Sequence, residues 1–223
     1  MTELTPHARR TARLLFEINA VLFNADKPFI FTSGRASPVY VDCRRIPSFV
    51  RTRRAIMEMG AQMLLDQAGA EAFDVVAGGE TAGIPYAAFL AEQMDLPMIY
   101  VRKQPKGHGR NAQIEGELRE GQRVLLVEDL ATDGGSKVRF CQALRDAGAI
   151  VEHIFVVFHY GIFAKSQQTM DELGVRLHAL ATWWDMLAVA REDKRFDLAT
   201  LDAVESFLRD PITWSRAHGG KED

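Results

Sequence analysis

The chain has 223 residues, of which 47% are hydrophobic and 26% are charged, so it is long enough for one sizeable globular domain. Its net charge of −3 argues against a protein that coats nucleic acid. The sequence has no apolar run of membrane-spanning length and no secretory signal, so we expect a cytoplasmic protein that contacts no membrane. Neither Cys43 nor Cys141 belongs to a CxxC pair, so we expect both thiols to be reduced.

The N-terminal segment predicts a helix followed by a hairpin. Apolar residues recur at helical spacing over residues 6–23. Two β-rich runs, FIFT at 29–32 and VYV at 39–41, then flank the turn-forming SGRASP, which is the pattern of a hairpin. Both elements precede the regular alternation of the remaining chain, so we expect them to form a small hood.

Short apolar runs alternate with helical patterns after the hood. The predicted helices cover residues 47–69, 83–94, 135–149 and 164–174, with one or two more at the end. The predicted strands cover residues 73–79, 97–102, 123–129, 151–160 and 175–181. Nearly unbroken apolar strands between helices indicate an α/β fold with a central, mostly parallel sheet flanked by helices.

We expect these elements to belong to one domain that spans residues 1–223. The hood would occupy about residues 1–45, the sheet and its helices about residues 46–210, and a tail residues 211–223. The polar end of this tail, from residue 215, predicts disorder.

Two adjacent carboxylates, Glu128 and Asp129, stand at the carboxyl end of a strand, where ligands bind in such sheets. The following turn, ATDGGS at 131–136, leads into a helix, so its backbone N–H groups suit a phosphate. Carboxylates accept hydrogen bonds from sugar hydroxyls, and the combination therefore indicates a phosphorylated sugar. The alternative is an ordinary strand–helix turn with Asp133 or Ser136 as the N-cap.

A second unusual stretch, YVRKQPKGHGR, gathers positive charge without an acidic residue. It contains Arg102, Lys103, Lys106, His108 and Arg110. We interpret it as a loop that closes over a compact polyanion such as pyrophosphate. A solvated basic surface loop is the alternative. The stretch offers no aromatic residue between its basic residues on which bases would stack, which argues against nucleic acid.

Four separated segments resemble one known family. The pattern around Glu128–Ser136 resembles the phosphoribosyl-diphosphate (PRPP) motif of the type I phosphoribosyltransferases. Arg-Lys-x-x-Lys-x-His-Gly at 102–109 resembles the catalytic loop of the orotate phosphoribosyltransferases, which are dimeric enzymes of pyrimidine synthesis. The segments FTSGRASPVYVD at 31–42 and GGETAGIPYAA at 78–88 are similar to two further segments of that family, in the same order.

The resemblance implies a reaction and a set of site residues. PRPP and orotate would give orotidine 5′-phosphate and pyrophosphate, in UMP biosynthesis. The enzyme would be a homodimer that shares the basic loop across its interface, and Mg²⁺ would be carried mainly by PRPP without direct protein ligands. The residues implied in catalysis are Lys106, His108, Glu128 and Asp129. Those implied in binding PRPP or pyrophosphate are Arg102, Lys103, Lys106, His108, Glu128, Asp129, Ala131, Thr132, Asp133, Gly134, Gly135 and Ser136. Those implied in binding orotate are Ser33, Gly34, Arg35, Tyr40 and Thr132.

Three places depart from the family's common pattern and leave the mode of orotate binding open. Thr32 stands where many members have Lys, Thr81-Ala82 where many have Tyr-Lys, and FHYG, which contains Tyr160, where some have Arg. One alternative function is a phosphoribosyltransferase for another base, and a second is a PRPP-sensing regulator of the same fold. The hood segment and the basic loop favour orotate, and no DNA-binding segment is recognisable.

Overall fold

The computed structural model describes residues 4–31, 33–105, 113–132 and 134–221. The chain divides into two compact units. The central unit is Pro47–Leu180, and the terminal unit combines Met1–Ile46 with Ala181–Asp223. The predicted hood and the predicted tail therefore lie in the same unit.

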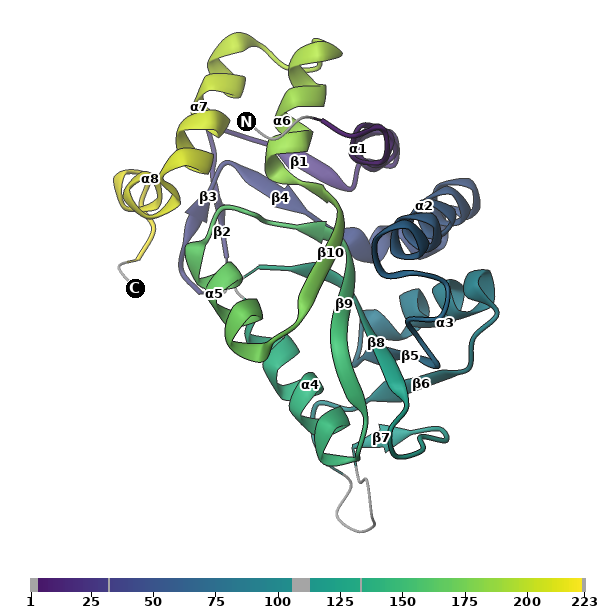
Figure 1. Cartoon of the computed structure of the whole chain (residues 1–223). Coiled ribbons are helices and arrows are strands. Elements are labelled where there is room, and N and C mark those ends of the chain that lie inside the picture. The colour runs from purple at the N-terminus through teal and green to yellow at the C-terminus, as the bar shows by residue number, and fades with distance from the viewer. Residues whose placement is uncertain (1–3, 32, 106–112, 133, 222–223) are drawn as a thin grey trace. The chain divides into compact units, whose positions relative to one another are not determined.

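The central unit is built on a six-stranded sheet with the strand order β10-β9-β8-β5-β6-β7 (Figure 1). The pairs β5–β6, β5–β8 and β8–β9 are parallel, and β6–β7 is antiparallel. This confirms the predicted mostly parallel sheet, to which the sequence analysis had not assigned β7. The strands are β5 (Val75–Gly79), β6 (Met98–Val101), β7 (Ile114–Glu115), β8 (Arg123–Ala131), β9 (Ile150–His159) and β10 (Arg176–Thr182).

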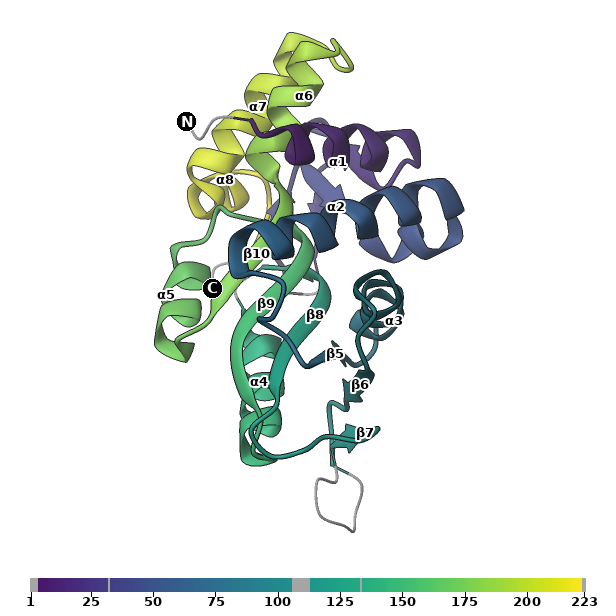
Figure 2. The same cartoon turned by 45° about the vertical axis from the view of Figure 1, so that its right-hand side comes forward.

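Helices cover both faces of this sheet, as predicted. Figures 1 and 2 place α2 and α3 on one face and α4 and α5 on the other. The 3-10 helix η1 (Cys43–Ser48) leads into α2, and Gly69 follows the last residue of α2. The helices are α2 (Val50–Ala68), α3 (Gly83–Met94), α4 (Gly135–Asp146) and α5 (Ala164–Leu173). No helix in the described part of the chain combines the length and the apolar character needed to cross a bilayer.

Two glycines let α3 pack closely against the sheet. A Cβ on Gly78 would lie 2.8 Å from the Cα of Ile84 and 2.9 Å from the carbonyl oxygen of Gly83, both of which are backbone atoms. A Cβ on Gly83 would overlap the carbonyl oxygen of Val127 in β8. Any side chain at either position would push the helix away from the strands. The start of α3 is therefore held against the ends of β5 and β8.

The terminal unit begins with α1 (Pro6–Glu17), which Thr5 caps by accepting a hydrogen bond from the backbone N–H of Ala8 at 3.1 Å. The predicted helix over 6–23 is wrong beyond Glu17, and Ile18 is the C-cap. Asn19 has a φ of 53°, which ends the helix, and the next residues form the strand β1 (Val21–Phe23). The β-forming residues of this strand follow a helical spacing by coincidence, and pairing with another strand decides their structure.

The predicted hairpin is present with different partners. Strand β2 (Phe29–Ile30) pairs with β3 (Ala36–Ser37), and β4 (Val39–Val41) pairs with β1. The VYV run was therefore assigned the wrong neighbour. Within residues 183–221, three helices rather than one or two close the chain: α6 (Trp183–Glu192), α7 (Leu198–Arg209) and α8 (Pro211–Ala217). The prediction of disorder from residue 215 is wrong for the part that lies in α8.

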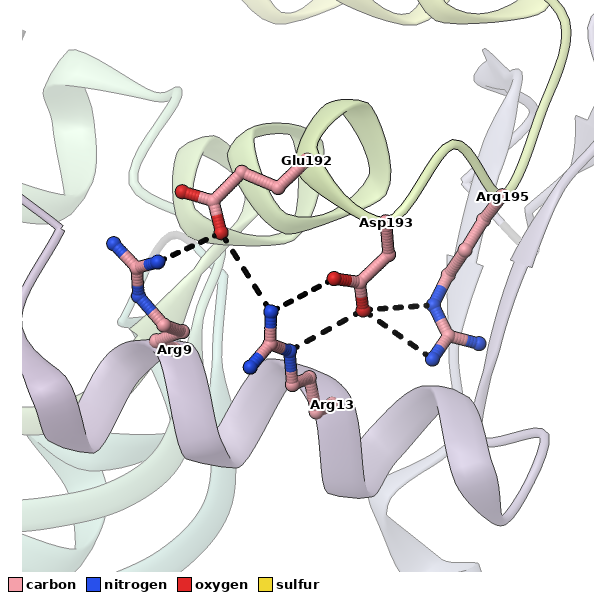
Figure 3. Close-up of polar contacts among 5 residues, drawn as sticks. All are labelled: Arg9, Arg13, Glu192, Asp193 and Arg195. Atoms are coloured by element: carbon pink, nitrogen blue, oxygen red, sulfur yellow. Dashed lines mark hydrogen bonds and ion pairs between the residues drawn. The ribbon is translucent and has the colours of Figure 1, made fainter.

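Ion pairs and aromatic rings hold the terminal unit together. Arg9 and Arg13 of α1 reach Glu192 and Asp193 at the end of α6, at 2.9 Å and 2.8 Å respectively, and Arg195 also contacts Asp193 (Figure 3). These side chains are partly exposed, so solvent screens the pairs and each contributes little to the stability of the fold. Aromatic packing also stabilises this unit, and it involves the buried rings of Phe16 and Trp183 and the half-buried rings of Phe23 and Phe196.

Candidate active site

The acidic pair lies at the carboxyl end of β8, as the sequence predicted. The four preceding residues of the strand are buried, and the side chains of Glu128 and Asp129 belong to residues that are only 7% and 6% exposed. Two adjacent carboxylates are rarely buried without a purpose, because each loses hydration and each disfavours ionisation of the other. Their environment therefore indicates what they are for.

Glu128 occupies a space that exists because residue 79 is glycine. A Cβ on Gly79 would overlap Oε1 of Glu128 and lie 2.7 Å from the ring of Phe140. Among the described residues, Oε1 of Glu128 accepts no hydrogen bond. A buried carboxylate oxygen without a partner costs about 1–3 kcal/mol or more in the free protein, and a ligand hydroxyl would remove that cost.

The buried position changes the acidity of Glu128. Burial raises its pKa to about 7, the nearby Lys137 and Lys103 oppose this change, and the charge of Asp129 adds to it. Lys137 is the closer opposing cation, with its Nζ 4.0 Å from Oε2 of Glu128. Glu128 is thus poised between its two protonation states near neutral pH.

Lys137 is a site residue that the sequence analysis missed. It is only 4% exposed, and its Nζ donates to the carbonyl oxygen of Leu130 at 2.7 Å and to Oγ of Ser136 at 3.3 Å. It therefore joins the end of β8 to the first turn of α4. A lysine in the first turn of a helix interacts unfavourably with the helix dipole. That unfavourable position is the feature of the sequence that could have identified Lys137 as a site residue.

The turn between β8 and α4 has the shape that a phosphate site needs. Gly134 is the N-cap of α4 with a φ of 88°, and a Cβ there would lie 2.7 Å from Met170 of α5. The N–H groups in the first turn of a helix commonly bind anions, and here the N–H of Lys137 donates to the carbonyl oxygen of Gly134 at 3.0 Å. The alternative interpretation offered Asp133 or Ser136 as the N-cap, whereas the N-cap is Gly134 and Ser136 lies inside the helix. Ala131 is buried and Thr132 half-buried beside this turn, while Asp133 lies outside the described residues.

A second turn lies at the same edge of the sheet, after β5. Glu80 follows that strand, and its Oε2 accepts a hydrogen bond from the backbone N–H of Lys103 at 2.6 Å. Its own N–H donates to the carbonyl oxygen of Val101 at 2.9 Å. Glu80 therefore attaches the start of the basic segment to the strand beside β8, a role that the sequence analysis did not assign.

The basic segment connects β6 to β7. At its base, the N–H of Arg102 donates to the carbonyl oxygen of Gln113 at 2.7 Å, and the side chain of Gln113 returns a bond to the carbonyl of Arg102 at 3.2 Å. Lys103 is exposed. The parallel strands β5, β6 and β8 end at one edge, so the two described cations lie on the same edge as the acidic pair. The remaining basic candidates, Lys106, His108 and Arg110, lie outside the described residues.

The structure places most of the orotate candidates in the terminal unit, whereas Thr132 belongs to the central unit. Ser33 is exposed, Gly34 is buried with a φ of 88°, and Arg35 and Tyr40 are half-buried. The hydroxyl of Tyr40 accepts a bond from Arg44 at 3.2 Å. Thr32 lies outside the described residues.

The departure at the end of β9 has an ordinary structural role. Tyr160 is buried, and its N–H donates to the carbonyl oxygen of Ala131 at 2.9 Å, which holds the end of β9 beside β8. His159 lies 2.9 Å from Oγ of Ser166, and burial together with the charge of Lys137 lowers its pKa. In the described part of the chain, no three His, Cys, Asp or Glu side chains are grouped so as to hold a metal ion.

Comparison with known proteins agrees with this geometry. Residues 51–177 match the Phosphoribosyl transferase domain, so the fold and the site define a phosphoribosyltransferase. Orotate phosphoribosyltransferase of Sinorhizobium fredii is 56% identical over 219 residues, which cover 98% of this chain and 94% of the relative. The chain belongs to the orotate phosphoribosyltransferase family, which confirms the resemblance of its four segments.

Solved structures share the fold. The crystal structure of orotate phosphoribosyltransferase from Aeropyrum pernix is 32% identical, with a TM-score of 0.68, and the match covers 83% of this chain and 99% of that one. The structure of Leishmania donovani UMP synthase is 27% identical, with a TM-score of 0.75, and the match covers 90% of this chain and 42% of that one.

The contact between Lys137 and Glu128 predicts a change in acidity. Lys137→Met removes the nearest cation, so the pKa of Glu128 rises further above its value of about 7, by about one pH unit or more. Lys103→Met is the matched control, and its effect is smaller because Lys103 is exposed and solvent screens its charge. The measurement is an NMR titration of glutamate carboxyl carbons, with the signal assigned by its loss in Glu128→Gln. Equal shifts in the two lysine variants would contradict this account.

Proposed function

We propose that the protein transfers the 5-phosphoribosyl group of PRPP to orotate, which releases pyrophosphate and forms orotidine 5′-phosphate for UMP synthesis. The observation that carries this proposal is the buried acidic pair at the end of β8, immediately before a glycine turn at the start of α4. The family to which the chain belongs agrees with the reaction.

PRPP would bind along this edge of the sheet. The turn at 131–136 would hold the 5′-phosphate through its backbone N–H groups and the hydroxyls of Thr132 and Ser136. Glu128 and Asp129 would accept hydrogen bonds from the ribose hydroxyls, which is supported by the unpartnered Oε1 of Glu128. The pyrophosphate would face the basic residues Arg102, Lys103, Lys106 and His108.

The chemistry requires charge compensation and positioning. As the bond from the ribose C1′ to pyrophosphate breaks, positive charge develops on the sugar, and a nitrogen of orotate attacks that carbon. The carboxylates of Glu128 and Asp129 would stabilise the developing positive charge, and the cations of the basic segment the negative charge on the leaving group. Lys106 or His108 would supply a proton to the pyrophosphate.

Orotate is an anion with a flat ring, and the candidate residues suit both features. The Arg35 guanidinium would pair with the orotate carboxylate, since its planar donors match two carboxylate oxygens. Ser33, Gly34 and Thr132 would supply hydrogen bonds to the ring. Tyr40 would pack against it, and the neighbouring rings of Phe29 and Phe31 support its position, with centroids 5.6 Å and 6.4 Å away.

Magnesium would enter with the substrate. Mg²⁺ prefers oxygen ligands and keeps several waters, so the diphosphate oxygens of PRPP are suitable donors without a protein cage. When bound there, the ion neutralises part of the charge on the diphosphate. The cations of the basic segment would then need to balance only the remaining negative charge.

Turnover of orotate is the direct test. Purified protein with PRPP and Mg²⁺ is expected to consume orotate, followed by its absorbance, and not adenine, hypoxanthine or uracil. Lys106→Ala is expected to lower kcat by about 10²- to 10⁴-fold, because it removes a group that interacts with the leaving pyrophosphate. Gln104→Ala is the matched control in the same segment and is expected to leave kcat within about twofold.

Two results would favour the alternatives. Consumption of another base in place of orotate would mean a different substrate on the same fold. Calorimetric binding of PRPP with no turnover of any base would mean a sensor. Either result would reject orotate transfer while leaving the fold assignment in place.

We also propose a cytoplasmic homodimer in which the basic segment of one subunit serves the site of the other. Mixing Lys106→Ala with Asp129→Asn then restores activity, because one site of each mixed dimer combines an intact segment with an intact acidic pair. Random mixing would regain roughly a quarter of wild-type activity, since half of the dimers are mixed and each has one working site. No recovery after proven subunit exchange would show that each segment serves its own subunit.

A further inference from the structure

Residues 215–221 contact the turn that carries three of the orotate candidates, Ser33, Gly34 and Arg35, and both segments lie within the terminal unit. The backbone N–H of Lys221 donates to the carbonyl oxygen of Gly34 at 2.9 Å. On the other side of Arg35, the N–H of Ala36 donates to Oγ of Ser215 at 2.9 Å. Two hydrogen bonds from the last seven described residues (215–221) therefore bracket Arg35.

Ser215 connects these two contacts. It is only 2% exposed, and its carbonyl oxygen accepts hydrogen bonds from Gly220 at 2.8 Å and from His218 at 3.1 Å. The same residue thus binds the hood through its hydroxyl and folds the C-terminal segment back through its carbonyl. A Cβ on Gly220 would overlap Oγ of Ser215 and lie 2.8 Å from the nitrogen of Ala36, so only glycine fits there.

The C-terminal segment is itself anchored. The rings of Trp214 and His218 stack with centroids 3.7 Å apart, and Nδ1 of His218 lies 2.8 Å from the carbonyl oxygen of Trp214. Trp214 also packs edge-on against Phe207 of α7, at 5.4 Å. The residues that reach the hood therefore extend from a packed helix.

The turn at Gly34 depends on this support. Its own closing bonds join the N–H of Gly34 to the carbonyl oxygen of Phe31 at 2.8 Å, and the N–H of Phe31 to that of Arg35 at 2.9 Å. A Cβ on Gly34 would lie 2.8 Å from Cδ and 3.1 Å from Cβ of Lys221, so the lysine side chain covers the backbone of the turn. A short exposed turn without such contacts would sample several conformations.

We propose that residues 215–221 are a positioning element for orotate: they fix the backbone at Gly34–Arg35 in the conformation that binds the base. This inference rests on the proposed function, since it takes Ser33–Arg35 as part of the orotate site. The segment touches no substrate. It acts by lowering the conformational freedom that the turn would lose when orotate binds.

The test removes the hydrogen bond at Gly34 and compares the two substrates. Lys221→Pro lacks the donating N–H, whereas Lys221→Ala keeps it and removes only the side chain. We expect Lys221→Pro to raise KM for orotate by about two- to tenfold, the range for one hydrogen bond, with KM for PRPP unchanged. We expect Lys221→Ala to have a smaller effect. A chain that ends at Lys221 is the control, since it keeps every contact described above, and it is expected to match the full chain.

The outcomes separate the two proposals. A parallel rise of both KM values, or no change for orotate in Lys221→Pro, would overturn the inference. Failure of the unmodified protein to use orotate would reject the proposed function instead. Amide hydrogen exchange would then still test whether the hydrogen bond from Lys221 to Gly34 holds the turn. If it does, we expect the amides of residues 33–36 to exchange more slowly in Lys221→Ala than in Lys221→Pro.

Discussion

The burial of two neighbouring carboxylates at the end of β8 is the constraint on which the candidate site depends. Burial raises the pKa of Glu128 to about 7, and Lys137 offsets part of that effect from 4.0 Å away. Lys137 also donates hydrogen bonds to the carbonyl oxygen of Leu130 and to Oγ of Ser136. The cation that stabilises the acidic pair therefore also connects the end of β8 to the start of α4. Oε1 of Glu128 is buried without a hydrogen-bond partner among the described residues, and under our proposal the hydroxyl groups of a ribose would donate to the two carboxylates.

Glycines determine how the surrounding elements meet this pair. Gly79 leaves the space that Glu128 fills, and Gly83 lets α3 contact the backbone of β8. Gly134 allows the turn into α4 to pass close to α5. In each case a side chain would occupy space that the site or its supports use. In the terminal unit, Gly34 and Gly220 have the same function where the C-terminal segment meets the hood.

Local pattern predicted most of the sheet and the acidic site, because buried parallel strands and glycine turns leave a strong signal in the sequence. Helix α3 was predicted with its observed bounds, and β8 was predicted with its observed start but two residues too short at its end. Pairing was less predictable: VYV has the composition of a hairpin strand, but only tertiary contacts select β1 as its partner. The C-terminal segment was misjudged for a related reason, since two of its hydrogen bonds are made by the backbone N–H groups of Gly220 and Lys221, and any sequence supplies such groups. Lys137 was overlooked because its importance follows from the burial of its side chain, and the polar sequence at the start of α4 does not show that burial.

The most direct test of the account is whether the acidic pair recognises the hydroxyls of a ribose phosphate. Calorimetry would compare ribose 5-phosphate with 2-deoxyribose 5-phosphate on the wild-type protein, Glu128→Gln and Asp129→Asn. We predict that the wild type prefers ribose 5-phosphate by about tenfold, as one hydrogen bond to a charged group would give. We also predict that at least one variant loses this preference while it still binds the deoxy compound. An unchanged preference in both variants would show that the carboxylates do not contact the sugar and would contradict the assignment of this site.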